Sequence, residues 1–484
     1  MRDEVRTSAA GLAAASARSW RRFPTYVAAA SGVLFAGALF EYGYLEGDTR
    51  ALIRDAAAIV SCLRAGQAHC PGAGKFPPFQ LLITVPALAL GASPNLAMRL
   101  LAATSTLCFL GLLLVTWRLL VGRSRAVALS LLLVFGSGEL IHYSTHSFAE
   151  MATAFFALGM AASWLTGKTA WIGATAFLAA TTKETAAPLL VVLALLCTLV
   201  PGEGPSFWRR ERGRFLALFA GLAAAAAAIA GLNEWRFGVP WNRTYLLEAR
   251  MSPHGWTHAR FAAALWLAPN GGWLFFWPLA VAVLACLPWA EKLRAGDRRP
   301  DRRLIVGAAA YLVLTTYLAS AWWAPFGWWC WGQRLMLPWL PPLLLLAGFA
   351  YAPGLARLWR PLVATPTRSV LLALLLATLA LPHVASLFRG EVLIHDTFMW
   401  DGGCPSPSVG AAEAHHRCIE GEAFRGPSPL LPAYRMLWHP FVRGRALLYT
   451  LLLFAGVFLL RTAFEDAEER GRSYPASGHP PSGT

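Results

Sequence analysis

A cluster of acidic residues follows the first apolar segment of a chain that has only 26 acidic residues in 484. The stretch LFEYGYLEGDTRALIRDA (39–56) contains Glu41, Glu46, Asp48 and Asp55. A carboxylate at this position, partly desolvated by lipid and aromatic neighbours, can accept a proton from a bound hydroxyl. Alternatively, the four residues only solvate a loop and pair with Arg50 and Arg54. Taken alone, the stretch leaves both interpretations open.

Other charged residues stand at the ends of apolar segments or inside them. Glu150, in IHYSTHSFAEMATAFF, begins one such segment; it can orient an acceptor, or it can simply favour a helix N-terminus through the helix dipole. Lys183, beside Glu184, interrupts the long apolar segment 169–200. A charge there costs free energy unless it is paired or has a function. Lys75 precedes a Pro-Pro pair, and Arg334 follows a Trp-rich stretch; both can be interfacial anchors.

Histidine and tyrosine side chains lie just before Glu150. His142, Tyr143 and His146 are candidates for binding a sugar or a metal. His142 and His146 have the i,i+4 spacing of a ligand pair on a helix, but two residues do not make a metal site. We therefore assign no metal ligands. A divalent metal cofactor stays possible but unsupported.

The composition around these residues is that of an integral membrane protein. The chain is 56% hydrophobic and 14% charged, with a mean hydropathy of +0.48. Soluble domains carry about a quarter charged residues. The net charge of +16 comes from short basic clusters between apolar segments, which is typical of loops facing anionic lipid. No nucleic-acid-binding motif is present, so we expect membrane lipid and no nucleic acid as a partner.

The apolar segments predict an all-α, polytopic membrane protein with about twelve transmembrane helices and interfacial helices in the first outer loop. The predicted spans are 25–43, 96–117, 126–141, 149–166, 170–181, 185–200, 215–232, 271–289, 304–322, 335–351, 369–388 and 446–461. Segment 76–92 is placed flat on the outer surface, and 169–200 is divided into a hairpin at TTKET (181–185). These two choices put the basic loops 208–214 and 291–303 inside.

This topology divides the chain into four parts. Residues 1–22 form a basic cytoplasmic N-terminus that precedes a signal anchor. Residues 23–351 form a transmembrane core that includes the first outer loop, 44–95. Residues 352–461 form C-terminal transmembrane helices with the outer loop 389–445, and residues 462–484 form a disordered cytoplasmic tail. The three large loops, 44–95, 233–270 and 389–445, lie outside, where a substrate-binding surface can be built.

Four of the eight cysteines fall in the outer loops. The pairs Cys62 with Cys70 and Cys404 with Cys418 can form disulfides, because disulfides persist in oxidising compartments. A zinc site is the alternative, since His69, His415 and His416 are adjacent. We prefer disulfides because the sequence has no CxxC spacing.

The order of several motifs resembles that of the GT-C-type integral membrane glycosyltransferases. The first loop has GDT (47–49), a helical stretch and then Lys75-x-Pro-Pro; Glu150 and ATTKET follow. Later stretches are WRFGVPWNRTYL (235–246), LAPNGGWLFFWP (267–278) and WWCWGQRLMLPWLPPLL (328–344). The groups they resemble most are bacterial protein-mannosyltransferase-like and lipid A aminoarabinose-transferase-like enzymes. The chain departs from them in having GDT rather than Asp-Glu, and Gly272 in place of an arginine.

This resemblance implies an inverting transferase that takes a sugar from a polyprenyl-phosphate donor at the extracytoplasmic face of the bacterial inner membrane. Asp48 is then the catalytic base and Glu150 the second acid. Lys75, Lys183 and Arg334 bind the phosphate, and His146 and Tyr143 help to bind substrate. The acceptor is not specified.

Two other functions compete with this interpretation. A lipid-linked sugar flippase or transporter would have mid-span charges and related halves. Only Lys183-Glu184 fits such a pattern, and no internal repeat is visible. An O-antigen ligase or polymerase fits the late loop 389–445 with its histidines, including His395 and His439. The arrangement from Asp48 to Lys75-x-Pro-Pro favours the glycosyltransferase.

Overall fold

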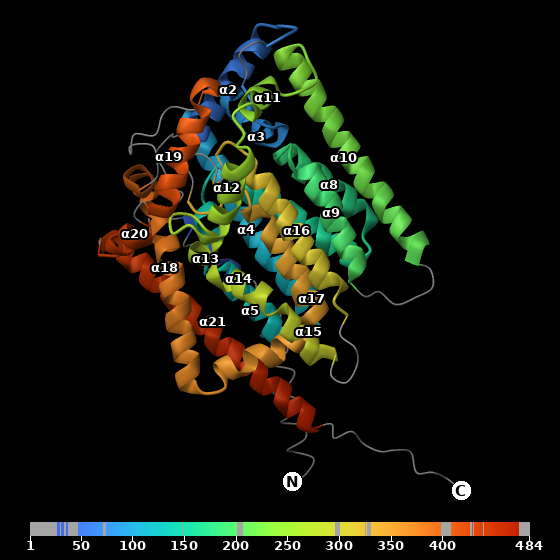
Figure 1. Ribbon diagram of the computed structural model, residues 1–484, viewed down its shortest axis with the longest axis vertical. Coiled ribbons are helices and arrows are strands. Elements are labelled where there is room, and N and C mark those ends of the chain that lie inside the picture. The colour runs from blue at the N-terminus through green and yellow to red at the C-terminus, as the bar shows by residue number, and fades with distance from the viewer. Residues whose placement is uncertain are drawn as a thin grey trace.

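A computed structural model of the chain contains helices and no strands in the part that it describes (Figure 1). The described residues are 27–29, 31–32, 35–36, 47–70, 74–147, 149–200, 207–295, 301–324, 326, 331–397, 408–425, 428, 430–438 and 440–473. The all-α class expected from the sequence is confirmed for these residues. The first predicted span, 25–43, lies mostly outside them.

Six helical segments in the described part are long and apolar enough to cross a membrane. They are α4 (Pro94–Leu120), α10 (Phe207–Phe237), α16 (Arg303–Ser320), the continuous η1 (Leu337–Trp339), α17 (Leu340–Trp359) and η2 (Arg360–Val363), α18 (Pro366–Thr397), and α21 (Pro440–Ser473). Three helices at the centre of the fold are shorter: α7 (Glu150–Thr166), α8 (Thr169–Thr182) and α9 (Ala186–Leu199). The predicted number of twelve spans is therefore not confirmed.

The division of segment 169–200 agrees with the prediction. Helix α8 ends at Thr182 and α9 begins at Ala186, because Lys183 has an extended backbone conformation, with φ −146° and ψ 109°. Helix α7 turns into α8 through Gly167, whose φ of 73° favours glycine. The turn after Thr182 places Lys183 and Glu184 beside the beginning of α7.

Two predicted spans are wrong in extent. Segment 271–289 is not one helix but three short ones: α13 (Trp273–Phe276), α14 (Pro278–Ala285) and α15 (Leu287–Ala295). Trp277 precedes a proline and is non-helical, as proline disfavours the α conformation at the preceding residue. Segment 126–141 divides into α5 (Arg125–Phe135) and α6 (Leu140–Tyr143), because α5 ends at Gly136.

The three predicted outer loops contain helices, several of which lie in the upper part of Figure 1. The first loop holds α2 (Gly47–Arg64) and α3 (Pro78–Ala89), the second α11 (Arg243–Ala249) and α12 (Gly255–Leu267). The last holds η3 (Val409–Ala411), α19 (Ala412–Arg425) and α20 (Leu430–Met436). Helix α3 is about 18 Å long, too short to span a bilayer, and begins at the second proline of Lys75-x-Pro-Pro.

Helix α21 extends beyond the boundary expected at residue 462. It continues to Ser473, so residues 462–473 are helical rather than disordered. Arg461 donates a hydrogen bond of 2.8 Å to Glu465 one turn later, and such i,i+4 pairs stabilise a helix. Residues 474–484 lie outside the described part.

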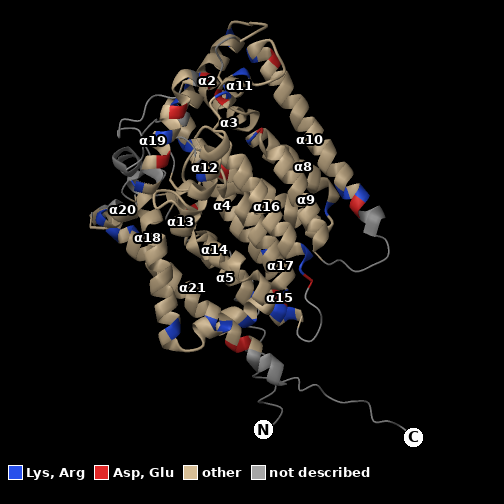
Figure 2. Ribbon diagram, in the orientation of Figure 1, with Lys and Arg blue, Asp and Glu red and all other residues tan. Residues whose placement is uncertain are grey.

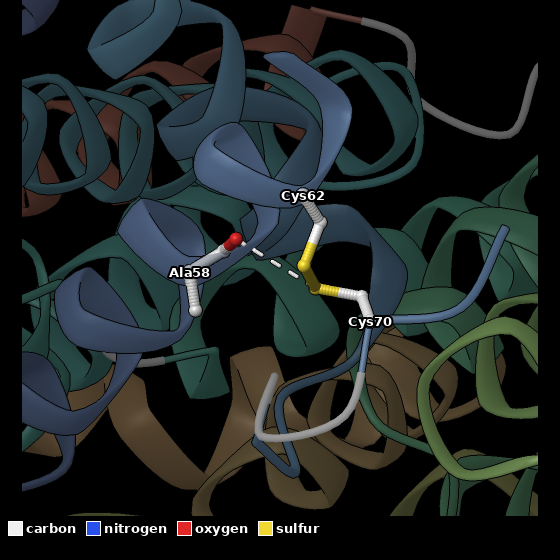
Figure 3. The surroundings of a disulfide bond; sticks show 3 residues. All are labelled: Ala58, Cys62 and Cys70. Carbon is white, nitrogen blue, oxygen red and sulfur yellow. Dashed lines mark hydrogen bonds between the residues drawn. A yellow bond between two sulfur atoms is a disulfide. The ribbon is translucent and has the colours of Figure 1, made fainter. Parts of the chain in front are cut away.

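Cys62 at the end of α2 is joined to Cys70 by a disulfide, with the two Cα atoms 5.7 Å apart (Figure 3). The sulfur of Cys70 lies 3.6 Å from the carbonyl oxygen of Ala58, so the bridge packs against α2 itself. Cys418 in α19 is also disulfide-bonded. Its predicted partner, Cys404, lies outside the described residues.

Charged residues are concentrated toward the ends of the helices, and the middle parts of the helices carry few of them (Figure 2). Helix α15, which carries Lys292 and Arg294, and the beginning of α10 lie toward the end opposite α2, α3 and α11 (Figures 1 and 2). Both belong to loops that the charge bias predicted to be cytoplasmic. Their common position agrees with that prediction without assigning a side of the membrane.

Helices α8 and α10 approach each other closely through two glycines. A Cβ atom on Gly221 of α10 would collide with the carbonyl oxygen of Gly173 in α8. Small residues allow such close approach of membrane helices. Gly231, farther along α10, has no atom within 4 Å of the position its Cβ would take.

We expect Gly221→Ala to lower the free energy of unfolding by about 1–3 kcal/mol, because the two backbones must move apart. Gly231→Ala is the matched control in the same helix, and it should be neutral or stabilise the protein by up to about 1 kcal/mol. Denaturation in detergent measures both. Equal effects of the two substitutions would contradict the close contact.

Candidate functional site

A cavity of about 660 Å³ lies among the helices at the end of the molecule that carries α2, α3 and α11. Its walls come from the beginnings of α2, α3 and α7, the turn between α8 and α9, helix α11, the end of α16 and residues 334–339. Pockets that bind small molecules have volumes of this order. Because its walls come from distant parts of the sequence, the cavity exists only in the folded chain.

The carboxylate of Glu150 joins two cations in this cavity. Lys183 donates a hydrogen bond of 3.3 Å to Glu150 Oε1, and Arg334 Nε lies 3.3 Å from the same oxygen. Glu150 is 4% exposed. A buried charge is costly unless it is paired. Lys183 is therefore paired with Glu150, the first residue of α7, rather than with its sequence neighbour Glu184.

Lys75 enters the same cavity from the segment before α3. Its Nζ forms an ion pair of 2.5 Å with Glu248 Oε1 and lies 5.7 Å from the centre of the Tyr245 ring. Both partners belong to α11. Lys75 and Glu248 are partly buried, with 24% and 15% of their side chains exposed.

The charges on the described walls of the cavity balance. Three cations (Lys75, Lys183 and Arg334) face three carboxylates (Glu150, Glu184 and Glu248). Burial raises the pKa of Glu184, while a hydrogen bond from Asn242 and the charge of Arg236 lower it. The cavity can accept an anion if a carboxylate gives up its cation.

The first turn of α2 borders the cavity through Thr49, whose hydroxyl lies 2.6 Å from the Ser147 hydroxyl. Ser147 also accepts, through its carbonyl oxygen, a hydrogen bond of 3.1 Å from Gln80. These contacts hold α2 and α3 against the segment that leads into Glu150. Asp48 precedes Thr49 in this turn, and its side chain lies outside the described part.

His146 and Tyr143 are not among the cavity-lining residues. Tyr143 donates a hydrogen bond of 2.8 Å to the carbonyl oxygen of Trp331, and His146 Nδ1 lies 2.5 Å from the carbonyl oxygen of His142. The rings of His142 and His146 are stacked, with centroids 3.8 Å apart. Both residues are buried. The described residues contain no group of three potential metal ligands.

Aromatic and apolar side chains complete the walls. Trp322, Trp323 and Trp339 line the cavity, and so do Leu189 and Leu318. Leu318, near the end of the apolar helix α16, lines the cavity and is 38% exposed. Part of the cavity wall is therefore apolar and comes from helices of low charge.

Several residues at this site have no assigned role in the sequence prediction. Glu184, Tyr245 and Glu248 line the cavity, and Asn242 and Arg236 stand behind it. Two motifs of the sequence contain most of these residues. TTKET (181–185) contains Glu184, and WRFGVPWNRTYL (235–246) contains Arg236, Asn242 and Tyr245. Asn242 also begins an Asn-x-Thr sequence. By pattern alone, this sequence indicates a glycosylation sequon and no role in the site.

Asp55, another member of the acidic cluster, lies behind the cavity. It is 4% exposed, and burial raises its pKa to about 6; the charges of Arg54, Arg236 and Lys75 and a hydrogen bond from the Gly74 amide act in the opposite direction. Asp55 therefore contacts the segment that carries Lys75. It supports the site rather than lining it.

Replacement of Asp55 with Asn should change how stability depends on pH. The carboxyl has an ordinary pKa of 3.8 and a raised pKa in the fold, so its contribution to stability is present at low pH and lost as pH rises through about 6. Between pH 4 and 7.5, Asp55→Asn should gain up to about 3 kcal/mol relative to wild type. Denaturation in detergent at several pH values measures this.

Asp301→Asn provides a control of opposite sign. A hydrogen bond from Arg303 lowers the pKa of Asp301, so this substitution should lose stability relative to wild type as pH rises. A pH-independent difference between wild type and Asp55→Asn would contradict the raised pKa of Asp55.

No protein-family model and no curated protein matches the sequence. Among solved structures, ArnT from Cupriavidus metallidurans bound to undecaprenyl phosphate is similar over 94% of this chain and 79% of that chain, at 16% identity and a TM-score of 0.46. The apo state of the same protein is similar over 91% and 78%, at 17% identity and a TM-score of 0.47. The activity of this chain is therefore inferred from its own cavity.

Proposed function

We propose that the protein is an inverting glycosyltransferase that moves a sugar from a polyprenyl-phosphate donor to an acceptor hydroxyl at the extracytoplasmic face of the membrane. The observation that carries this proposal is the convergence of Lys75, Lys183 and Arg334 in one cavity between membrane helices. Three cations near a membrane surface, in a space of this size, suit a phosphate that is attached to both a sugar and a lipid.

The apolar part of the cavity supports a lipid-linked donor. Leu189 and Leu318, which line the cavity, come from the apolar helices α9 and α16. A polyprenyl chain can lie along such a wall while its phosphate meets the cations. A water-soluble nucleotide sugar would gain nothing from this apolar wall.

The chemistry proposed for the site is a single displacement at the anomeric carbon. The acceptor oxygen forms a bond to that carbon as the bond from carbon to phosphate oxygen breaks, so the configuration inverts and polyprenyl phosphate leaves. The acceptor proton passes to Asp48, which belongs to the turn of α2 beside the cavity. Glu150 holds Lys183 and Arg334, so its proposed role is to position these phosphate-binding cations.

The proposed orientation follows from charge. The basic residues of α15 and of the beginning of α10 lie toward the end of the molecule opposite α2, α3 and α11 (Figure 2), whose residues line the cavity, and basic loops are usually cytoplasmic. The cavity then faces the extracytoplasmic side, where a disulfide such as Cys62–Cys70 is stable. The sugar and the acceptor are left unspecified.

Asp48→Asn should reduce sugar transfer by about 10²–10⁴-fold, because an amide cannot accept the acceptor proton. The assay is sugar release from a panel of radiolabelled polyprenyl-phosphate sugars by purified protein, with folding checked by the denaturation midpoint. The matched control is Glu46→Gln in the same acidic cluster, which should retain activity.

Two outcomes of this assay would contradict parts of the proposal. Equal turnover by wild type and Asp48→Asn would remove Asp48 from the mechanism. Binding of the lipid-linked sugars by wild type, with their transfer across a bilayer and no sugar release, would favour a flippase instead of a transferase.

Glu248→Gln should strengthen binding of undecaprenyl phosphate roughly two- to tenfold. Glu248 pairs with the ammonium of Lys75, so a phosphate must compete with this carboxylate. The expected gain in binding free energy is about 0.4–1.4 kcal/mol. Displacement of a labelled lipid phosphate measures it. Glu420→Gln, which removes the ion pair with Arg260 between α12 and α19, is the control and should bind as wild type does. Weaker binding by Glu248→Gln would contradict the competition.

A further inference from the structure

Lys75 lies in a segment without regular structure, yet its backbone is held by side chains from a distant part of the chain. Arg236, near the end of α10, donates through Nη1 to the carbonyl oxygens of Gly74 at 2.6 Å and Phe76 at 2.8 Å. Asn242, before α11, donates through Nδ2 to the carbonyl oxygen of Lys75 at 2.9 Å. Three successive carbonyl groups thus have side-chain donors more than 150 residues away in sequence.

The opposite side of this segment is also filled. The Gly74 amide donates a hydrogen bond to Asp55. A Cβ atom on Gly74 would overlap with the Asp55 carboxylate, so the backbone passes directly over that group. The segment before α3 is consequently fixed between α2 and the end of α10.

Burial of the Arg236 guanidinium costs free energy unless its N–H groups are hydrogen-bonded. Arg236 is 2% exposed, and its Nη2 donates to Asn233 Oδ1 at 2.5 Å. The negative charges of Glu184 and Asp55 act on it. A guanidinium presents several donors in a rigid plane, so one side chain can serve two carbonyl groups at once. Here Nη1 serves both carbonyl groups while Nη2 binds Asn233, and the single nitrogen of a lysine could not take both places.

Asn242 connects the backbone of Lys75 to the groups that meet its side chain. Besides its bond to Lys75, Nδ2 donates to Glu184 Oε1 at 3.3 Å, and Oδ1 accepts from the Tyr245 amide at 3.3 Å, as a cap at the beginning of α11. Helix α11 then presents Tyr245 and Glu248 to the Lys75 ammonium.

We propose that Arg236 and Asn242 are positioning residues of the donor site, which set the place of the Lys75 ammonium by holding the carbonyl groups of residues 74–76. This inference rests on the proposed role of Lys75 in binding the donor phosphate. Neither residue touches the donor itself. Their loss weakens phosphate binding because Lys75 samples other positions, even when the protein stays folded.

The reactivity of Lys75 toward an amine-acylating reagent tests this proposal. Full-length protein in detergent is labelled with and without undecaprenyl phosphate, and modification of Lys75 is quantified by mass spectrometry. We expect undecaprenyl phosphate to protect Lys75 in wild type. In Arg236→Met and Asn242→Asp, the lipid concentration for half-protection should rise at least tenfold. Asn242→Asp keeps the oxygen that caps α11 but loses the donor to Lys75.

Arg243→Gln is the matched control, because Arg243 is adjacent to Asn242 but exposed. It should have the half-protection concentration of wild type. Two further variants decide by the same tenfold criterion if Arg236→Met fails to fold. They are Asn242→Asp and Arg236→Lys, which keeps the charge but loses the two separate nitrogens that bind residues 74–76 and Asn233. Thermal denaturation shows that the variants compared are folded.

The outcomes separate the two levels of the proposal. Protection in wild type with unchanged half-protection in the folded variants would overturn the positioning role and leave the proposed function intact. Absence of protection in wild type would contradict the phosphate role of Lys75 and therefore overturn both.

Discussion

The carboxylate of Glu150, held by Lys183 from one side and approached by Arg334 from another, lies among helices made almost entirely of apolar residues. An isolated charge in such surroundings costs several kcal/mol, so these three residues can be buried only together. Each belongs to a different segment: the beginning of α7, the turn between α8 and α9, and the segment before η1. Pairing of the charges therefore requires these segments to meet, and the cavity forms where they do.

The same requirement explains the second half of the site. Lys75 pairs with Glu248, and the carbonyl groups around Lys75 are satisfied by Arg236 and Asn242. Unpaired backbone groups would be costly in a buried segment without helical hydrogen bonds. One half of the cavity is thus built on α7, α8 and α9, and the other on α2, α3 and the α10–α11 connection. Thr49 and Ser147 join the two halves.

Much of the helical architecture follows from hydrophobicity and helix-breaking residues. The division at TTKET and the helix after Lys75-x-Pro-Pro agree with the prediction, because Lys183 interrupts a buried apolar segment and a proline suits the first turn of a helix. The predicted span 271–289 failed for a related reason. Its apolar composition suggested one helix, but the proline after Trp277 and a second proline at 288 divide it. The helical extension of α21 depends on charged side chains that hydropathy counts as polar.

The sequence by itself determined that the chain is helical, apolar enough for a membrane, and supplied with charged residues at Lys75, Glu150, Lys183 and Arg334. It did not determine their partners. Lys183 stands beside Glu184 in the sequence but pairs with Glu150, and Lys75 pairs with Glu248 across 173 residues. His146 and Tyr143 have suitable chemistry, yet their hydrogen bonds and burial keep them out of the cavity walls. Only tertiary structure decides such matters, because burial and electrostatic pairing depend on which segments are brought together, whatever their separation along the chain.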